Sequence, residues 1–575
     1  MRRIKYIHGL SLIDVIVGVA IMTLVFMALF ASFQAASEFG ARNRLRANAL
    51  LLANEHLEII RALPFDSIGT VGDLPSGTIP QLEDIVVDGH TYTRRTFIQY
   101  VDDPADGIGA ADSLAADYKR VKVELSYEYH GVVQTFSLVT TIAPKAQESL
   151  AGAGILRINV TDAMNDPIPS AWVHVLNNTV ATSVDITTYT NASGTVSLPG
   201  AWAGPGYEIE VTKPGYSSAQ TYSATTSNPN PSPSPATVAE NSTTEIYFKI
   251  DRTSTLTVAT QAWPVYGRLF DTFADASQLA SLENTQVLGG SVTLAGAPGT
   301  YSAAGTSTSV SISPTSLGSW LLLSFDDNVP ANTNVYYQLQ FDTGGGVFSL
   351  VPDSDLPGNE TGFVSGPVDI SGLGTSTYTS LRLQAILTTN DPTAAPEIYE
   401  WKLSYQAAPV PVGNVDFVLQ GSKTIGTDAG GGPLYKYDQT HQTSATGIWQ
   451  GSSMEWDQYN LQVTSHTVGE ACPALPLVLD PDTVYEQTLT VSPTTTHALR
   501  LYVGNPIGNS VEHAEVHVAG GSTDETRASG PCGYVYVPGL ASDTYTVSVE
   551  AVGFAATSTS ISVSGITDAS IVLSY

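Results

Sequence analysis

The chain has 575 residues and a net charge of −30, from 24 Lys and Arg against 54 Asp and Glu. This acidic balance argues against a nucleic-acid partner, which needs a basic protein face, and it suits a soluble extracellular surface. Charged residues are only 14% of the chain, Gly and Pro number 50 and 33, and short alternating runs of Val, Thr and Tyr recur, so we expect several β-sandwich modules.

The first 33 residues combine a short basic leader with a long apolar run. Arg2, Arg3 and Lys5 precede Gly9, and no charged side chain occurs from Val15 to Phe33. Such a run is long enough to cross a bilayer as a helix, and the basic residues favour a cytoplasmic leader. In a secretory signal peptide the small residue of the cleavage site follows the apolar region, whereas Gly9 precedes it. A cut after Gly9 therefore leaves the helix on the mature protein.

This N-terminus resembles that of type IV prepilins and of the related pseudopilins of type II secretion. The resemblance implies that a prepilin peptidase cuts after Gly9, that Leu10 is then N-methylated, and that the apolar helix packs against other pilin subunits. It also gives Asp14 a role in assembly, because most family members carry Glu at this fifth mature position, where the acid pairs with the α-amino group of a neighbouring subunit. The alternative is a plain membrane anchor, with the Asp14 carboxylate at the membrane interface.

Residues 10–63 are predicted to form one helix, which Pro64 ends. Its second half carries apolar residues on or near one face, namely Leu45, Leu52, Leu57, Ile60 and Leu63. Residues 79–143 then alternate as antiparallel strands, with turns at Asp88-Gly89 and His130-Gly131. A long helix followed by such a sheet, over residues 10–143, is the pilin architecture, and it is similar to PilV-type minor pilins and pseudopilins.

A repeat begins after a flexible linker. Leu156–Val160 and Leu499–Val503 match as first strands, and a weaker copy lies between them with residues 414–419 as its first strand. Each copy continues into a glycine turn, because glycine supplies the positive φ that the turn needs. The repeats resemble the carboxypeptidase regulatory-like and Cna B-type sandwiches, and we assign them to residues 155–253, 411–494 and 496–575.

Residues 255–406 lack these marks and are similar to the jelly-roll sandwiches of bacterial surface proteins. A Pro/Ser tract at residues 228–236 is either a stiff spacer or a loop of the first sandwich. The expected fold is therefore mainly β and multidomain. After a leader of residues 1–9 come a pilin-like α+β domain, three Ig-like sandwiches of the carboxypeptidase regulatory-like kind, and one jelly-roll-like sandwich.

No catalytic constellation stands out, so we expect no enzymatic activity. His174 and His517 occupy equivalent strand positions and are expected to face solvent. The first strands of the repeats contain no Lys, so we expect no Lys–Asn isopeptide crosslink of the Cna B kind. Cys472 and Cys532 either pair, which would tie two modules together, or stay apart.

No cofactor is expected, but two acidic loops leave calcium open as an alternative, because calcium takes several oxygen ligands around one loop. These loops are Asp102–Asp112 and Asp353–Glu360, and neither has EF-hand spacing. Among the aromatic residues, Trp263, Tyr266 and Trp401 either stack on sugar rings or belong to the core.

These features lead to the hypothesis of a type IV minor pilin. The protein would be a single-pass protein of the inner membrane before assembly, and then part of an extracellular pilus. At the pilus tip or surface its sandwiches would adhere to a glycan or protein ligand or prime assembly. Two alternatives stay open, a type II secretion pseudopilin and a membrane-anchored carbohydrate-binding or hydrolytic surface protein.

Overall fold

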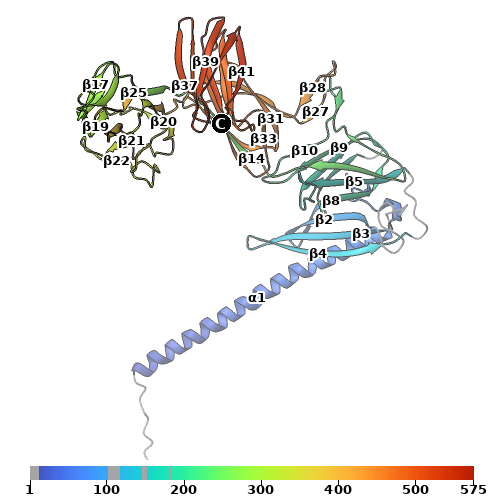
Figure 1. Ribbon diagram of the computed structural model, residues 1–575. Helices are drawn as coiled ribbons and strands as arrows, with labels where there is room; N and C mark the ends of the chain where they lie inside the picture. Colours follow the sequence, from blue (N-terminus) through green and yellow to red (C-terminus); the bar gives the residue numbers. More distant parts are fainter. Residues whose placement is uncertain (1–11, 102–116, 145–151, 181–182) are drawn as a thin grey trace, which may run out of the picture. The chain divides into compact units, whose positions relative to one another are not determined.

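The computed structural model describes residues 12–101, 117–144, 152–180 and 183–575. The chain forms two compact units. Unit 1 comprises Met1–Arg252 and Thr424–Leu434, and unit 2 comprises Thr253–Lys423 and Tyr435–Tyr575. One long N-terminal helix is followed by many mostly antiparallel sheets, which confirms the mainly β, multidomain fold (Figure 1).

Helix α1 (Leu12–Ala62) has 51 residues and two different halves. Every described residue from Ile13 to Arg44 is exposed. In the second half, buried residues recur every three or four positions, as expected for a helix that packs on a sheet: Leu45, Ala49, Ala53, Leu57 and Ile60. The helix ends just before Pro64, which cannot continue it, so the prediction of one long helix is confirmed over the described residues.

The sheet of unit 1 that covers this helix face is an antiparallel meander in the order β1-β2-β3-β4 (Figure 1). Its strands are β1 (Leu82–Val87), β2 (His90–Val101), β3 (Tyr118–Tyr129) and β4 (Val132–Ile142). Asp88 (φ 51°) with Gly89 (φ 79°), and His130 (φ 51°) with Gly131 (φ 76°), form the two hairpin turns. Both turns fall where the sequence predicts them, because two consecutive residues with positive φ match the strand twist.

Two buried polar residues of this helix–sheet core were not predicted. The ring Nε2 of His56 lies 3.1 Å from the hydroxyl of Thr96. Lys119 is fully buried, and its Nζ donates hydrogen bonds of 2.8 Å to the carbonyl oxygens of Phe65 and Ile68. Lys119 therefore holds the chain that leaves the helix, including the 3-10 turn η1 (Phe65–Ser67), against the sheet.

The first sandwich, also in unit 1, packs a sheet in the order β13-β5-β8 against a sheet in the order β10-β9-β6-β7, with β12 on β9. Its strands are β5 (Ala153–Thr161), β6 (Trp172–Asn177), β7 (Val184–Tyr189), β8 (Thr195–Trp202), β9 (Gly204–Thr212), β10 (Ala219–Gln220), β12 (Ala236–Val238) and β13 (Thr243–Lys249). The last strand, β13, runs parallel to the first, β5. The Pro/Ser tract is a loop of this sandwich, and it carries β11 (Asn230–Pro231), which pairs with β27 (Thr424–Thr427).

The C-terminal sandwich, in unit 2, repeats this plan, with sheets β38-β35-β41 and β37-β36-β39-β40. Its strands are β35 (Ala498–Gly504), β36 (Glu515–Gly520), β37 (Thr523–Ala528), β38 (Tyr534–Pro538), β39 (Asp543–Glu550), β40 (Thr557–Val563) and β41 (Ile566–Val572). Again the last strand, β41, is parallel to the first, β35. The two outer copies of the repeat therefore share one topology.

The middle copy corrects one strand assignment. Its first strand is β14 (Ser254–Gln261), which runs parallel to the last strand and antiparallel to β30, as β5 does to β13 and β8. Residues 414–419, predicted as the first strand, lie largely in β26 and correspond to the second. The other strands are β26 (Asp416–Gly421), β29 (Asp438–Gln442), β30 (Ile448–Met454), β31 (Asp457–Val463), β32 (Thr467–Cys472), β33 (Leu477–Leu479) and β34 (Val484–Ser492). The strand β28 (Pro433–Tyr435), which begins in the Thr424–Leu434 segment of unit 1, pairs with β27 of the same segment.

The remaining sandwich is thus inserted between the first two strands of the middle copy. Gln261 and Pro411 form a β-bridge where the insertion leaves and returns. Its strands are β15 (Tyr266–Asp271), β16 (Leu279–Glu283), β17 (Thr285–Leu288), β18 (Ser291–Leu294), β19 (Ala304–Ser309), β20 (Leu317–Asn328), β21 (Thr333–Asp342), β22 (Phe348–Leu350), β23 (Val368–Asp369), β24 (Leu381–Thr389) and β25 (Glu397–Ala407). Trp401 is 1% exposed in this core, so it is not a sugar-stacking residue.

Candidate functional site

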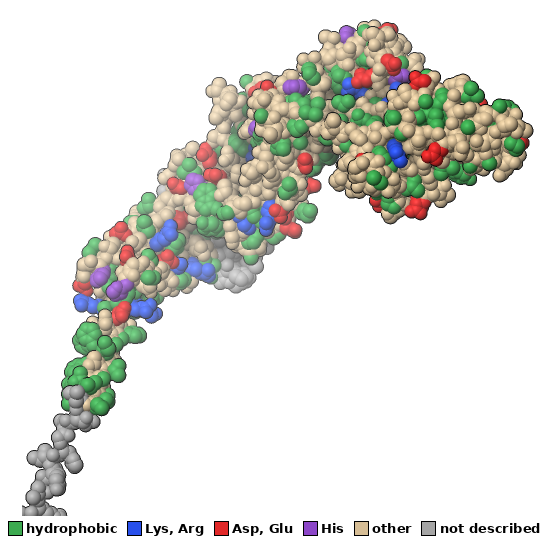
Figure 2. Space-filling model, turned by 90° about the vertical axis from the view of Figure 1, so that its left-hand side faces the viewer, with side chains coloured by type: hydrophobic (Ala, Val, Ile, Leu, Met, Phe, Trp, Pro, Cys, Tyr) green, Lys and Arg blue, Asp and Glu red, His purple; other side chains and the backbone are tan. Residues whose placement is uncertain are grey.

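The first half of α1 presents an apolar surface that nothing in the chain covers over the described residues. Large side chains are between 48% and 74% exposed along this stretch, among them Val15, Met22, Leu24, Phe30 and Phe33. Figure 2 shows hydrophobic side chains gathered on the helix next to the grey N-terminal residues. By length and composition, it is the one described helix able to cross a membrane. An apolar surface this large requires lipid or protein as its cover.

The predicted processing and assembly residues belong to the same end of the helix. Gly9 and Leu10 lie outside the described residues. Asp14 lies in the first turn of α1, which begins at Leu12. A carboxylate at this position precedes an uninterrupted apolar stretch, where a buried charge would be costly without a partner.

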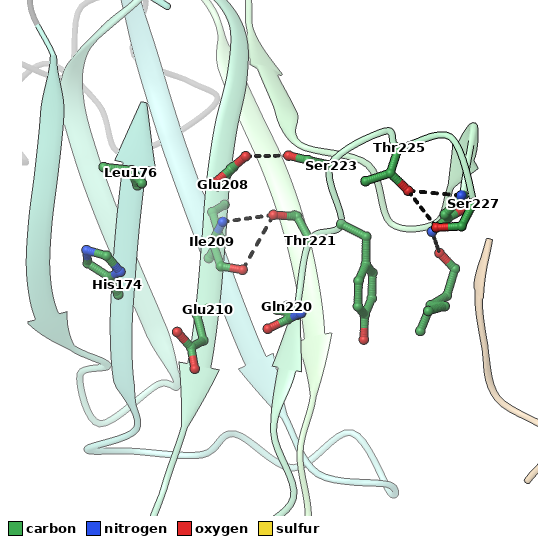
Figure 3. Close-up of a pocket in the computed structure, with 13 residues that line it drawn as sticks. His174, Leu176, Glu208, Ile209, Glu210, Gln220, Thr221, Ser223, Thr225 and Ser227 are labelled. Carbon is green, nitrogen blue, oxygen red and sulfur yellow. Dashed lines mark hydrogen bonds between the residues drawn. The ribbon is translucent and has the colours of Figure 1, made fainter. Parts of the chain in front are cut away.

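A second candidate site is a polar hollow of about 520 Å³ in unit 1, on the outer face of sheet β10-β9-β6-β7. Figure 3 shows Glu208 and Glu210 on β9 with Ile209 between them, and Thr221 and Gln220 on the neighbouring segment. The Ser223 hydroxyl donates to the Glu208 carboxylate, and the Thr221 hydroxyl accepts a 2.9 Å bond from the Ile209 N–H. The Glu208 carboxylate and the hydroxyls of Ser223 and Thr221 are thus already hydrogen-bonded within the protein.

His174 forms the other wall of this hollow. Its Nε2 lies 2.8 Å from an oxygen of Asp185, and its ring stacks on Trp172 with centroids 5.6 Å apart. His517 has an equivalent partner, Asp524, at 2.5 Å. Both histidine side chains are partly exposed, at 29% and 42%, as expected for the outer face of a sheet. The repeated His–Asp pair is a contact between neighbouring strands of a sheet.

The structure describes only one of the two acidic loops that were considered for calcium binding. The whole Asp102–Asp112 loop lies outside the described residues. In the other loop, Asp353 accepts a 2.7 Å bond from the Glu360 N–H, and Asp355 accepts one from the Tyr378 hydroxyl. Its carboxylates therefore stabilise the loop itself. Across the described residues, no group of three or more His, Cys, Asp or Glu side chains is placed to hold a metal ion.

Cys472 and Cys532 form a disulfide bond. It joins the end of β32, in the middle sandwich, to the turn before β38, in the C-terminal sandwich. Beside it, an oxygen of the Glu470 carboxylate accepts bonds of 3.0 Å from the Cys532 N–H and 3.4 Å from the Tyr534 N–H. Of the two alternatives for the cysteines, pairing between modules is the one observed.

The repeats share a structural signature that was not predicted. A hydroxyl residue stands four positions before the turn glycine in all three copies, in the pairs Thr190 and Gly194, Thr443 and Gly447, and Ser529 and Gly533. Each hydroxyl is buried and accepts a hydrogen bond from a backbone N–H at the start of the second strand. Each glycine carbonyl accepts a 2.8 Å bond from the first strand, at Val160, Thr260 and Val503. The spacing of hydroxyl and glycine is readable in the sequence, but the strand that meets each glycine is visible only in the structure.

No protein-family model and no curated protein matches this chain. Among solved structures it is similar to the Bacillus anthracis TIE protein, at 8% identity and a TM-score of 0.16, covering 86% of this chain and 72% of that one. It is also similar to BcpA, the major pilin subunit of Bacillus cereus (11% identity, TM-score 0.13, 73% and 99% covered). A third similar structure is the major pilin SpaD from Corynebacterium diphtheriae, at 10% identity and a TM-score of 0.14, covering 72% of this chain and 92% of that one. At such TM-scores the likeness carries no argument about function.

Proposed function

We propose that this protein is a minor pilin of a type IV pilus. A prepilin peptidase cuts it after Gly9, Leu10 is N-methylated, and α1 holds it in the inner membrane until it joins other pilin subunits in an extracellular filament. The observation that carries the proposal is the division of α1 into a half exposed and apolar on all sides and a half buried against its own sheet.

This division fits a subunit that exchanges one apolar environment for another. Burial of apolar surface stabilises by about 25 cal/mol per Å², so the exposed half of α1 favours either lipid or the packed helices of a filament over water. The second half already has its cover in β1 to β4. A simple membrane anchor would not need its helix to continue into the core of a folded domain.

The sandwiches support a minor position. Residues 152–575 follow the helix–sheet domain and form four further modules. Such bulk is hard to place on every subunit of a helical shaft but is easily carried at a tip, where it can adhere to a surface or prime assembly. A type II secretion pseudopilin has little use for these modules.

N-terminal mass spectrometry of sheared filaments tests the proposal. We expect a peptide that begins with methylated Leu10, and we expect Gly9→Val to abolish both cleavage and incorporation. Gly40→Val is the matched control, because it makes the same change on an exposed helix surface with no atom within 4 Å of the new Cβ. Normal processing of Gly9→Val, or retention of the wild-type chain in the cell envelope without filaments, would contradict the proposal, and retention would favour the pseudopilin or anchor alternatives.

The role of Asp14 needs its own variants. Asp14→Ala should prevent incorporation, because the pairing with a neighbour's α-amino group is lost. Asp14→Glu should leave incorporation unchanged or raise it, because Glu keeps the charge and adds reach. Equal incorporation of wild type and Asp14→Ala would show that the carboxylate has no part in assembly.

A further inference from the structure

The helix–sheet domain of unit 1 leaves one long strand edge unpaired. Strand β4 ends the meander β1-β2-β3-β4, and no backbone group of the described residues pairs with its far side. Figure 1 shows it at the edge of the sheet beside α1. With 11 residues, β4 is the longest edge strand in the described parts of the chain. A row of outward N–H and C=O groups of this length is a template for a strand of another chain.

The sequence of β4 does not protect this edge. Natural edge strands are usually protected by a charged side chain, a proline or a bulge. The run Val132–Ile142 contains no charged residue and no proline, and its register with β3 is unbroken. Phe136 and Leu138 pack towards α1, so the alternate residues face outwards. Among these, Val133 and Val139 are 65% and 58% exposed. The edge is therefore open to pairing and carries apolar side chains on its outer face.

The opposite edge of the same sheet, β1, has complementary features. Its free side also has no backbone partner among the described residues. Val87 packs towards α1, so Leu82 and Val86 face outwards, and these two side chains are 61% and 68% exposed. Both edges of the sheet thus present exposed apolar residues on the face away from α1.

Basic side chains line the β4 edge on the side of α1. Arg42 donates a 3.4 Å bond to the Gln134 side chain, and Arg61 donates a 2.6 Å bond to the Thr140 hydroxyl. Arg61 also pairs with Glu58, whereas no acid of the described residues forms an ion pair with Arg42. Two β4 edges placed together would bring the arginines of both copies together, so their charges disfavour that pairing.

The β1 edge has the opposite sign. Its two acids are Glu83 and Asp84. Glu83 pairs with Arg94, whereas Asp84 accepts a 2.7 Å bond from the Thr93 hydroxyl and adds a negative charge with no ion pair among the described residues. A β1 strand beside β4 therefore brings unlike charges to the same edge, which favours this partner over a second β4.

The direction of the strands fits a second copy of this chain. In the meander β1 and β3 run in the same direction, and β4 is antiparallel to β3. The β1 strand of a second copy in the same orientation therefore runs antiparallel to β4 and continues the alternation of the sheet. Both α1 helices then point the same way, as two copies in one membrane must. An antiparallel pair of two β4 strands would reverse one helix.

We propose that β4 of one copy pairs with β1 of a second copy, so that one sheet continues from copy to copy. Leu82 and Ser137 lie at one level of the sheet, through the pairs that join β1 to β4. A neighbour at the same height therefore sets its Val86 opposite Val133, with both outer faces on the same side. Such a head-to-tail contact can repeat along a row of copies. The inference goes beyond the proposed function, because it does not depend on cleavage after Gly9 or on filaments.

The experiment uses disulfide crosslinking of the full-length chain in phosphatidylcholine vesicles. Val86→Cys and Val133→Cys proteins with tags of different size are reconstituted together and treated with a mild oxidant. Cys472 and Cys532 are already paired with each other, so they give no background. Because a disulfide forms only between residues whose Cα atoms lie within about 7 Å, we expect the mixed product to exceed the product of either variant alone about tenfold. Val347→Cys, at a valine that is 62% exposed in unit 2, replaces Val133→Cys as the matched control for random collisions.

A scan along β4 separates strand pairing from other contacts between copies. Cysteines at the outward positions Thr135, Ser137 and Val139 are each mixed with Val86→Cys, and Gln134→Cys represents the side of α1. Strand pairing should give the highest yield at one outward position and background yield at Gln134, because side chains alternate between the faces. Three results would overturn the proposal: background yield at every position, equal yields on both faces, or as much product from Val133→Cys alone as from the mixture, which would mean that two β4 strands meet.

Discussion

Each of the three repeats depends on one glycine. A Cβ on Gly194, Gly447 or Gly533 would lie 2.5 Å, 2.5 Å and 2.8 Å from a carbonyl oxygen of the first strand of its sandwich. All three glycines also have positive φ, between 69° and 80°. The residue is thus required twice, by backbone conformation and by the close approach of the first strand.

This double requirement can be measured with a pair of variants. Gly539 has a similar φ of 72° but open space around it, so Gly539→Ala should cost only the backbone strain, about 1 kcal/mol. Gly533→Ala adds a clash with Val503 and Ser510 and should cost about 3 kcal/mol. Calorimetry of the unit 2 transition gives both values, and equal losses would show that the close approach relaxes without cost.

Glu470 makes a pH-dependent contribution to the stability of unit 2, at the junction of the middle and C-terminal sandwiches. Burial raises the pKa of its carboxyl above the usual value of 4.5, although the N–H groups of Cys532 and Tyr534 oppose the shift and Glu512 adds to it. Between 4.5 and this raised pKa the folded state binds more protons than the unfolded state, so stability rises as the pH falls through that window. Glu470→Gln keeps an acceptor and should remove this dependence. Denaturant unfolding at a series of pH values checks it, and parallel pH profiles for wild type and variant would contradict it.

At the scale of elements, two adjacent residues of α1 can show how much the buried helix face contributes to the stability of the helix–sheet domain. Ile60 is fully buried, and the adjacent Ile59 is 54% exposed. Ile60→Ala should therefore destabilise the domain by about 2–4 kcal/mol, whereas Ile59→Ala should cost less than about 1 kcal/mol. Hydrogen exchange of the amides in β3 is the measurement, because it reports this domain alone. Equal protection in both variants would mean that the second half of the helix contributes little to the core.

The elements that the sequence predicts well are those with local signals. The helix shows its apolar spacing and its terminating Pro64, and both hairpins of the first sheet show their turn residues. The first strand of the middle sandwich has no local signal, because β14 pairs in parallel with a strand more than 220 residues away. The sites divide in the same way. Gly9 and Asp14 belong to a contiguous motif, whereas Cys472 and Cys532 meet only after folding.

At the scale of the whole molecule, the disulfide is the covalent link between modules. It closes a separation of 60 residues, for which the chain-entropy model gives about 4 kcal/mol. The double variant Cys472→Ser with Cys532→Ser should lower the stability of unit 2 by roughly that amount and split its unfolding into two transitions. Reductant added to the wild type serves as the control and should give the same change. A single unchanged transition in the double variant would show that noncovalent contacts already couple the two sandwiches.

The inserted sandwich has a mechanical consequence. Its two ends meet at the bridge between Gln261 and Pro411, so it leaves and rejoins the middle sandwich at one place. When the chain is pulled from its ends, tension enters β14 and passes through its parallel pairing with β34 in shear, the direction in which strands resist best. Residues 262–410 then form a side branch that stays slack until that bridge breaks. If this subunit is pulled by flow, the force passes through β14 and β34, and the inserted sandwich stays folded and carries no load.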